Sequence, residues 1–201
     1  MKTNLPSQED ILFQEEKNSS HGAWLQNPTN KFFLYSEGYK DAGKRLYDFC
    51  IENSFYRNSL IYPIVFAYRQ FLELRLKELI IMGYDYVDSK KDFTDIHYLK
   101  TLWKIYKYEI LINIEQIEKE TLDNVERVLF QFDEEDPLSM TFRYPVTKSR
   151  EQSLKRNTID LENFKEVIDR LIYFMDWQWE MISNYKIFKT ELMSDMYSDW
   201  R

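Results

Sequence analysis

The sequence predicts an all-α protein, an antiparallel up-down bundle of four to six amphipathic helices. Residues that break helices are scarce, with four glycines and five prolines in 201 residues, whereas the two together make up about 12% of an average chain. Apolar residues recur at every third or fourth position in several segments, which is the helical period. Aromatic residues form 17% of the chain, a content that favours a packed core over disorder.

The first two helices are expected over residues 31–52 and 59–82. The second is the clearest in the chain, because its apolar residues form one stripe along the helix. Ser59 suits the N-cap position, where a hydroxyl can accept a backbone N–H, and Gly83 suits a C-terminal stop. Residues 1–30, which begin polar and acidic, are expected to form an N-terminal arm with one candidate short helix.

Two further helices are expected over residues 96–108 and 112–132, the first of them capped by Thr94 or Asp95. Residues 138–157 lack a helical period and are predicted to form a loop.

The last long helix is expected to have Asp160 as its N-cap and to continue, past a break near Asn184, into a C-terminal extension. The predicted division is therefore an arm (residues 1–30), a helical bundle (residues 31–185) and the extension (residues 186–201). The links between helices are short, which favours antiparallel neighbours.

Charge, cysteine content and hydropathy limit the function classes. The formal net charge is −7, so a nucleic-acid site would have to be a local basic patch. Cys50 is the only cysteine, which excludes an internal disulfide and a cysteine-rich zinc site and predicts a buried, inert thiol. No segment approaches about 18 uncharged apolar residues, and the N-terminus lacks the apolar core of a signal peptide. We therefore expect a cytoplasmic protein that does not span a membrane.

Three charged residues form the first candidate site. Arg69, Glu73 and Lys77 lie at positions i, i+4 and i+8 of the predicted second helix, so they share one stripe on which the sign of charge alternates. One interpretation is a structural ion ladder. The other is a ligand-binding pocket in which the Glu73 carboxylate orients the two basic groups.

His97 and Arg143 are the candidate catalytic residues. His97 falls in the first turn of its predicted helix, where the helix dipole favours a neutral ring that can accept a proton. The alternative is a packed histidine bonded to the backbone or to Glu73. Arg143 and Tyr144 stand in the non-helical segment 142–145, and an arginine beside an aromatic ring can hold a phosphate or stack on a base. The alternative is that Arg143 only closes carbonyls of its loop.

Motifs of other chemistries are missing from the sequence. It has no phosphate-binding or dinucleotide-binding glycine loop, no Gly-x-Ser-x-Gly, no His-Glu-x-x-His and no Glu-x-x-His. Neither a metal ion nor a cofactor is therefore predicted. The C-terminal region carries more tryptophans than one inward helix face needs (Trp177, Trp179 and Trp200), which suggests a contact with another subunit.

Three motifs resemble, in order and rough spacing, those of HEPN domains. They are Glu73-x-x-x-Lys77, then His97-x-Leu99-x-x-Leu102, then Arg143-Tyr144-Pro145 before the final helix. The resemblance covers about residues 31–185. It implies a four- to five-helix up-down bundle, often dimeric, of the kind found in prokaryotic toxin–antitoxin, phage-defence and nucleotidyltransferase-partner systems. Many HEPN domains are metal-independent ribonucleases with an Arg-x4–6-His signature, and neither His21 nor His97 has an arginine at that spacing.

The sequence is compatible with three functions, and it does not decide whether the protein is an enzyme. A non-catalytic HEPN-like module, expected as a homodimer, would bind a partner protein (nucleotidyltransferase-like or a defence component), a nucleotide or RNA. A metal-independent ribonuclease would use His97 as general base and Arg143 or Arg69 to stabilise the phosphorane-like charge. A structural oligomerisation module would use the charged residues only to hold its fold. The ribonuclease requires its side chains to converge in one cleft. Convergence of His97 with Arg143, open to solvent, would favour the first two functions, and burial of both with saturated hydrogen bonds would favour the third.

Overall fold

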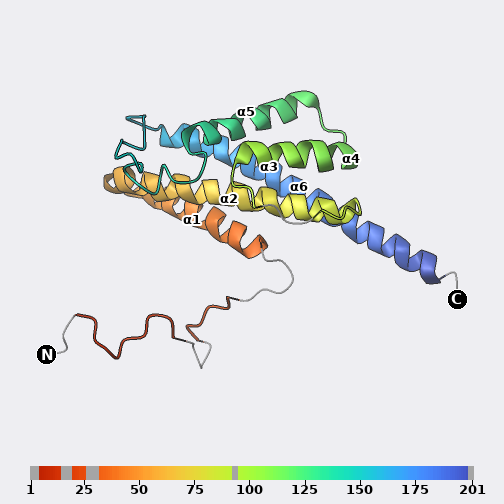
Figure 1. The fold of residues 1–201 in the computed structure, drawn as a ribbon, viewed down its shortest axis with the longest axis horizontal. Coiled ribbons are helices and arrows are strands. Elements are labelled where there is room, and N and C mark those ends of the chain that lie inside the picture. The colour runs from red at the N-terminus through yellow and green to blue at the C-terminus, as the bar shows by residue number, and fades with distance from the viewer. Residues whose placement is uncertain (1–4, 15–19, 26–31, 92–94, 199–201) are drawn as a thin grey trace. The chain divides into compact units, whose positions relative to one another are not determined.

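The structure is a computed structural model that describes residues 5–14, 20–25, 32–91 and 95–198. The chain divides into two compact units, Met1–Lys31 and Phe32–Arg201. Every helix of the described residues lies in the second unit (Figure 1). Since the described residues contain helices and no strand, the predicted all-α class is confirmed.

The first unit contains turns but no helix in its described parts, residues 5–14 and 20–25. Leu12, Phe13 and Trp24 are 88%, 92% and 89% exposed. A helix shorter than about 12 residues is marginal in water unless an apolar surface packs on it. The short helix expected in the arm is accordingly absent from these described parts.

The second unit is a helical bundle of consecutive rods. Its elements are α1 (Phe33–Glu52), a 3-10 turn (Ser54–Tyr56), α2 (Arg57–Tyr86), α3 (Leu99–Ile105), a π-helical turn (Tyr106–Leu111), α4 (Ile112–Ile114), α5 (Lys119–Glu135) and α6 (Leu161–Ser198). The π-helical turn joins α3 and α4 without a gap, so the three make one rod. Counted in this way, the described residues hold five helices, which lies within the predicted four to six.

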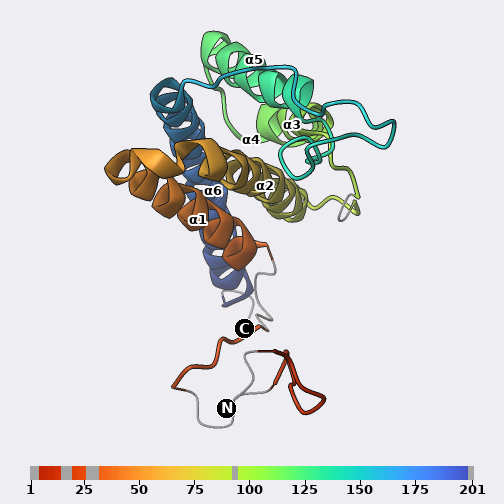
Figure 2. The ribbon, with the colours of Figure 1, turned by 90° about the vertical axis from the view of Figure 1, so that its left-hand side faces the viewer.

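Helix α2 is the centre of the bundle and contacts α1, α3 and α6 (Figures 1 and 2). More than half of its 30 residues are buried, so the single apolar stripe expected for this helix is wrong. A helix that is apolar on several sides is typical of a bundle interior. Helix α2 begins at Arg57 and not at Ser59, whose hydroxyl donates to the Tyr56 carbonyl at 3.0 Å.

The C-terminal half of α2 passes very close to the π-helical turn, and Gly83 permits this approach. A Cβ at this position would lie 2.3 Å from Cγ2 of Ile110. The glycine therefore serves close packing, and α2 continues past the predicted stop to Tyr86. Because the π-helical turn is packed against α2 and stays helical, the break expected between residues 108 and 112 lies at residues 115–118 instead.

The N-terminus of α3 is capped by a side chain from another helix. Asp133 of α5 accepts the backbone N–H of Leu99 through Oδ1 at 2.9 Å and that of Lys100 through Oδ2 at 2.7 Å. Asp95, one of the two expected caps, lies outside the helix with its side chain 93% exposed, and Thr94 lies outside the described residues. A carboxylate at a helix N-terminus is favourable, and this cap ties α3 to α5.

Helix α6 confirms its predicted cap. The Oδ1 atom of Asp160 accepts the backbone N–H of Asn163 at 3.0 Å. The helix then runs unbroken through Asn184 to Ser198, so the expected break is absent.

The cysteine prediction and the membrane prediction can both be compared with the structure. Cys50 is fully buried, as expected. Among the residues that the structure describes, no helix has both the length and the apolar character that crossing a bilayer requires.

Candidate functional site

The Glu73 carboxylate is the centre of a cluster of charged side chains. Arg69 donates through Nη1 to Oε2 at 3.1 Å, and Lys77 donates through Nζ to Oε1 at 2.9 Å. The same Oε1 lies 2.8 Å from Nδ1 of His97. Arg69, Glu73 and Lys77 therefore meet, as their helical spacing indicated, and His97 makes the contact with Glu73 that was the structural alternative for it.

Burial separates the members of this cluster. The side chains of Arg69, Lys77 and Glu73 are only 0%, 5% and 6% exposed, whereas that of His97 is 53% exposed. The first three are buried, and Arg69 lies under the chain at His97 and the loop after α5, whose carbonyls it contacts. Only His97 presents a ring nitrogen to solvent.

The Arg69 guanidinium donates hydrogen bonds within the protein from all three of its nitrogens. In addition to Glu73, it donates through Nη2 to the carbonyls of His97 at 2.6 Å and Pro137 at 3.3 Å, and through Nε to that of Asp136 at 3.4 Å. An arginine in this position holds two loops onto α2. The contacts of Arg69 therefore favour a structural role over ligand binding.

Two members of the cluster, Glu73 and Arg69, have shifted pKa values. Burial raises the pKa of the Glu73 carboxyl, but the hydrogen bonds from Lys77 and His97 and the charges of Lys77 and Arg69 outweigh it, so that the pKa lies below its ordinary value. Burial lowers the pKa of the Arg69 guanidinium, and neighbouring carboxylates oppose this lowering. Glu73 is therefore a fixed carboxylate under the His97 ring.

His97 lies two residues before α3 and not in its first turn, so the dipole argument made for it does not apply. Its ring is instead oriented by Glu73. A carboxylate can only accept hydrogen bonds, so we assign the proton to Nδ1, which leaves Nε2 on the exposed side, 3.6 Å from the exposed Asp95. A histidine held at one nitrogen by a buried carboxylate is an arrangement suited to general base catalysis.

The loop after α5 holds Arg143 and Tyr144. Asp136 organises this loop, because its Oδ1 accepts the backbone N–H groups of Met140 at 2.6 Å and Thr141 at 2.9 Å. Ser139 adopts a positive φ of 57°, and its carbonyl accepts Nε of Arg143 at 2.7 Å. The loop is therefore held together by its own polar groups, and Nε of Arg143 is used in a hydrogen bond to a carbonyl of the loop.

The outer part of the Arg143 side chain is exposed and aromatic rings flank it. Its guanidinium carbon lies 5.5 Å from the ring centre of Phe66 and 5.4 Å from that of Tyr144. Tyr144 is 51% exposed. Arg143 also donates through Nη2 to Sδ of Met140, so Tyr144 and only the remaining part of the Arg143 guanidinium are open to a ligand.

His97 and Arg143 lie along one face of α2 but do not touch. Arg143 contacts Phe66 of α2, and His97 contacts Glu73 of the same helix. These two α2 residues are seven positions apart, which corresponds to about 10 Å along the helix axis. Gln70, between them on this face, donates to Ser139 Oγ at 2.6 Å. Within the part of the chain that the structure describes, no hydrogen bond or ion pair joins His97 to Arg143. The face they share is called the α2 loop face below.

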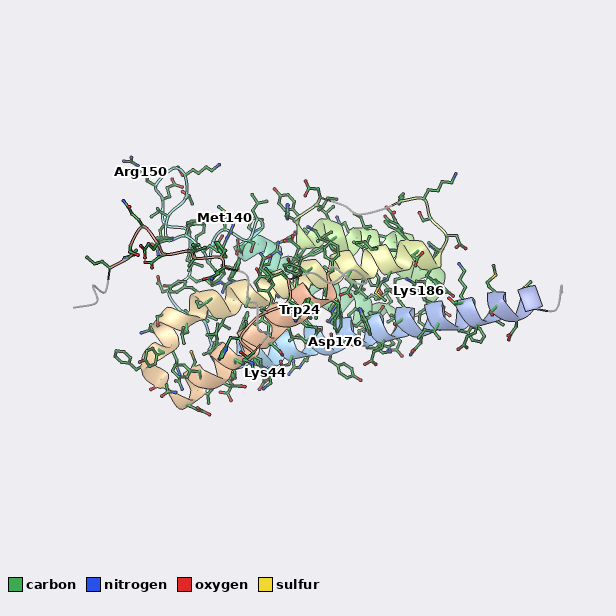
Figure 3. The ribbon with its side chains drawn as sticks, turned by 90° about the horizontal axis from the view of Figure 1, so that it is seen from below. Trp24, Lys44, Met140, Arg150, Asp176 and Lys186 are labelled. Carbon is green, nitrogen blue, oxygen red and sulfur yellow. The ribbon has the colours of Figure 1, made fainter. Side chains whose placement is uncertain are left out.

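A basic hairpin next to this face was missed in the sequence. Residues 145–153 fold back through a bridge between Val146 and Gln152, and the Thr147 N–H donates to the Glu151 carbonyl at 2.8 Å. Its tip carries Lys148 and Arg150, both exposed, and Figure 3 shows Arg150 at the outer edge of the molecule in that view. The signal was a plain charge count: residues 143–156 contain five basic residues and one acidic residue.

A second buried ion cluster on α2 was also missed. Arg75 donates to Glu78 at 2.9 Å, to Asp176 at 3.2 Å and to the Glu37 carboxylate. Its guanidinium is enclosed by the rings of three aromatic residues, Phe33, Phe71 and Trp179. These contacts join α1, α2 and α6, and they indicate a structural role.

The surplus tryptophans have different positions. Trp179 is half-buried and donates through Nε1 to Glu78 at 2.8 Å, so it faces this subunit. Trp177 is 41% exposed, and Trp200 lies outside the described residues.

Among the described residues, no group of three or more histidine, cysteine, aspartate or glutamate side chains is placed to hold a metal ion. Comparison of the chain with family models, with curated proteins and with solved structures finds no match. The resemblance to HEPN domains therefore stays a prediction.

Proposed function

We propose that this chain is a non-catalytic HEPN-like helical module that binds RNA across the α2 loop face and the basic hairpin. The observation that carries the proposal is a local surplus of positive charge. Residues 143–156 hold five basic residues against one acidic residue, a charge of +4, so the rest of a chain of net charge −7 carries −11. Clustered, exposed cations on an acidic protein are the electrostatic pattern of a nucleic-acid site.

The side chains on this surface suit single-stranded RNA. Tyr144 offers a ring on which a base can stack, and Arg143 beside it can stack or contact a phosphate. Lys148 and Arg150 extend the positive surface along the hairpin. Arg69 and Gln70 fix the loop to α2 and Asp136 ties the loop to itself, so the loop that carries Arg143 and Tyr144 is held in place before a ligand arrives.

The resemblance to HEPN domains supports the same function. The all-α fold and the order of the three motifs agree with it, and the missing Arg-x4–6-His signature favours binding over cleavage. From the resemblance alone we expect a homodimer that acts in a prokaryotic defence or toxin–antitoxin setting beside a nucleotidyltransferase-like or other partner.

The test is RNA binding by the full chain, measured by fluorescence anisotropy of a labelled single-stranded RNA at several salt concentrations. The charge-reversal variant Lys148→Glu/Arg150→Glu is compared with Lys44→Glu/Arg170→Glu, which makes the same charge change on α1 and α6. Lys44 lies well away from Arg150 in Figure 3. Circular dichroism checks that both variants fold.

We expect the hairpin variant to bind far more weakly than the control. Each cation that pairs with a phosphate of a single strand adds about 0.7 to the steepness of log affinity against log salt, so removing two such cations makes the dependence shallower by about 1.4. If the two variants bind equally, or if the unchanged protein does not bind RNA at low salt, the proposal is wrong.

A second candidate function, metal-independent RNA cleavage, has one observation in its favour, the hydrogen bond between Glu73 and the exposed His97 ring. The expected meeting of His97 with Arg143 is not found, since the two contact α2 about two turns apart. Total RNA is incubated with the protein and a chelator, and His97→Gln is compared with His21→Gln, which alters the only other histidine. Removing a general base costs about 10²–10⁴ in rate. Equal cleavage by both variants, or none by the unchanged protein, excludes this function.

A further inference from the structure

A cavity of about 330 Å³ lies between α2, α5, the first turns of α6 and the chain that precedes α6. Its wall is formed mainly by apolar side chains, with Val128 and Phe132 from α5, Phe164 and Val167 from α6, and Phe142 from the loop. The cavity is open to solvent on one side, so a small molecule can enter it from the surface of the bundle.

The cavity exists because α5 and α6 are held apart at this end. The two helices make few close backbone contacts, and Phe132 and Phe164 meet edge to face, with ring centres 6.1 Å apart. Val128, Phe132, Phe164 and Val167 are each only partly buried. Their unburied apolar surface faces an opening that a ligand can fill, with a gain of free energy for each apolar group removed from water.

The rim of the cavity is polar and carries one cation, Arg156, and two carboxylates, Glu135 and Asp160. Arg156 and Glu135 form an ion pair in which Nε and Nη2 of the arginine both approach Oε1 of the glutamate. The ion pair does not use Nη1 of Arg156 or Oε2 of Glu135. A ligand can therefore accept a hydrogen bond from the first atom or donate one to the second. Asn163 adds an amide to the rim. A neutral polar group fits here better than an anion, because the Arg156 charge is already paired with Glu135 and Asp160 adds a further negative charge.

We propose that this cavity binds a neutral, largely apolar small molecule, aromatic or branched aliphatic, that carries one hydroxyl or amide group. An apolar cavity of about 150 Å³ holds one benzene ring. A cavity of about 330 Å³ therefore holds roughly twice that, on the order of 12 non-hydrogen atoms. The apolar body packs among the three phenylalanine rings, and the polar group reaches Arg156 and Glu135.

The proposal does not rest on RNA binding, but the two sites are adjacent in the chain. Phe142 lines the cavity and precedes Arg143 directly, and Arg156 ends the basic segment. A ligand in the cavity thus contacts both ends of the segment that carries the basic hairpin.

The test uses 2-naphthol, two fused aromatic rings with one hydroxyl, and isothermal titration of the full chain. Val167→Trp fills the cavity, and Val146→Trp places the same substitution on the hairpin, where Val146 is 52% exposed. We expect saturable binding at one site in the unchanged protein and in Val146→Trp, and binding at least about tenfold weaker in Val167→Trp. The anion 2-naphthoate should bind more weakly than 2-naphthol to the unchanged protein.

A second measurement covers the case in which Val167→Trp does not fold. In methyl NMR spectra of the unchanged protein, 2-naphthol should shift the methyl signals of Val128, Val167 and Ile168 and leave those of Val146 in place. Absence of saturable binding, shifts that avoid these cavity methyls, or equal affinity of the two folded variants would each overturn the proposal.

Discussion

Replacement of Arg69 by methionine tests how much the bundle depends on its buried charges. The methionine side chain keeps much of the apolar stem, but it leaves the Glu73 carboxylate and three loop carbonyls without this donor. Removing one partner of a buried ion pair costs about 3–5 kcal/mol. Because Lys77 and His97 still contact Glu73, we expect the lower end of this range, about 3 kcal/mol.

This destabilisation is large compared with the total stability of a domain, which is about 5–15 kcal/mol. For a domain of this length, 1 kcal/mol shifts the melting temperature by roughly 2–4 °C, so Arg69→Met should melt about 6–12 °C lower. Urea unfolding and thermal melting followed by circular dichroism measure both quantities. The control is Arg170→Met on α6, where the side chain is 75% exposed and the change should stay within about 0.5 kcal/mol. If Arg69→Met is destabilised by less than about 1 kcal/mol more than this control, the reasoning about the buried cluster is refuted.

Three further outcomes follow from single contacts. The pKa of Glu73 is lowered in the fold, so this carboxylate adds stability that is present above the ordinary value of 4.5 and is lost as the pH falls through the lower folded value. Glu73→Gln should therefore lower the free energy of unfolding at neutral pH and flatten its decline below pH 4.5. Urea unfolding across the acid range measures both effects. Gly83→Ala should destabilise the protein by about 1–3 kcal/mol through overpacking on Ile110. Gly38→Ala, whose added methyl group meets nothing within 4 Å, should stabilise α1 by about 0.5–1 kcal/mol. Thermal melting should therefore show a lower melting temperature for the first variant and a higher one for the second. Asp133→Ala should cost about 1 kcal/mol or more because the cap is removed and speed hydrogen exchange at the amides of Leu99 and Lys100, so unchanged exchange at these two amides would contradict the cap.

Local spacing predicted the parts of the structure that depend on one helix alone. The scarcity of glycine and proline indicated the all-α class, and the i, i+4, i+8 spacing placed Arg69, Glu73 and Lys77 on one stripe. The cap of α6 could be read from Asp160 because its partner, the N–H of Asn163, lies three residues away.

The parts that were missed depend on residues far apart in the sequence. Charged residues at helical spacing are usually solvated, and nothing local shows that the loop after α5 covers Arg69. The cap of α3 comes from Asp133, 34 residues beyond Leu99. Likewise Arg75 meets Asp176 across 101 residues, so its cluster could not be read from α2. The basic hairpin is different, because a charge count of residues 143–156 would have found it.

The contacts of Arg69 also decide which variants can separate function from folding. Its guanidinium holds the His97 carbonyl and the loop that carries Arg143, so a substitution of Arg69 displaces the whole α2 loop face together with the bundle. Loss of RNA binding or cleavage in such a variant would therefore say nothing about chemistry. His97 is the opposite case, since its ring is half exposed and its removal leaves Arg69 and Lys77 paired with Glu73. A His97 variant that melts like the unchanged protein but differs from it in RNA binding or cleavage would locate the function in the exposed ring and not in the buried charges beneath it.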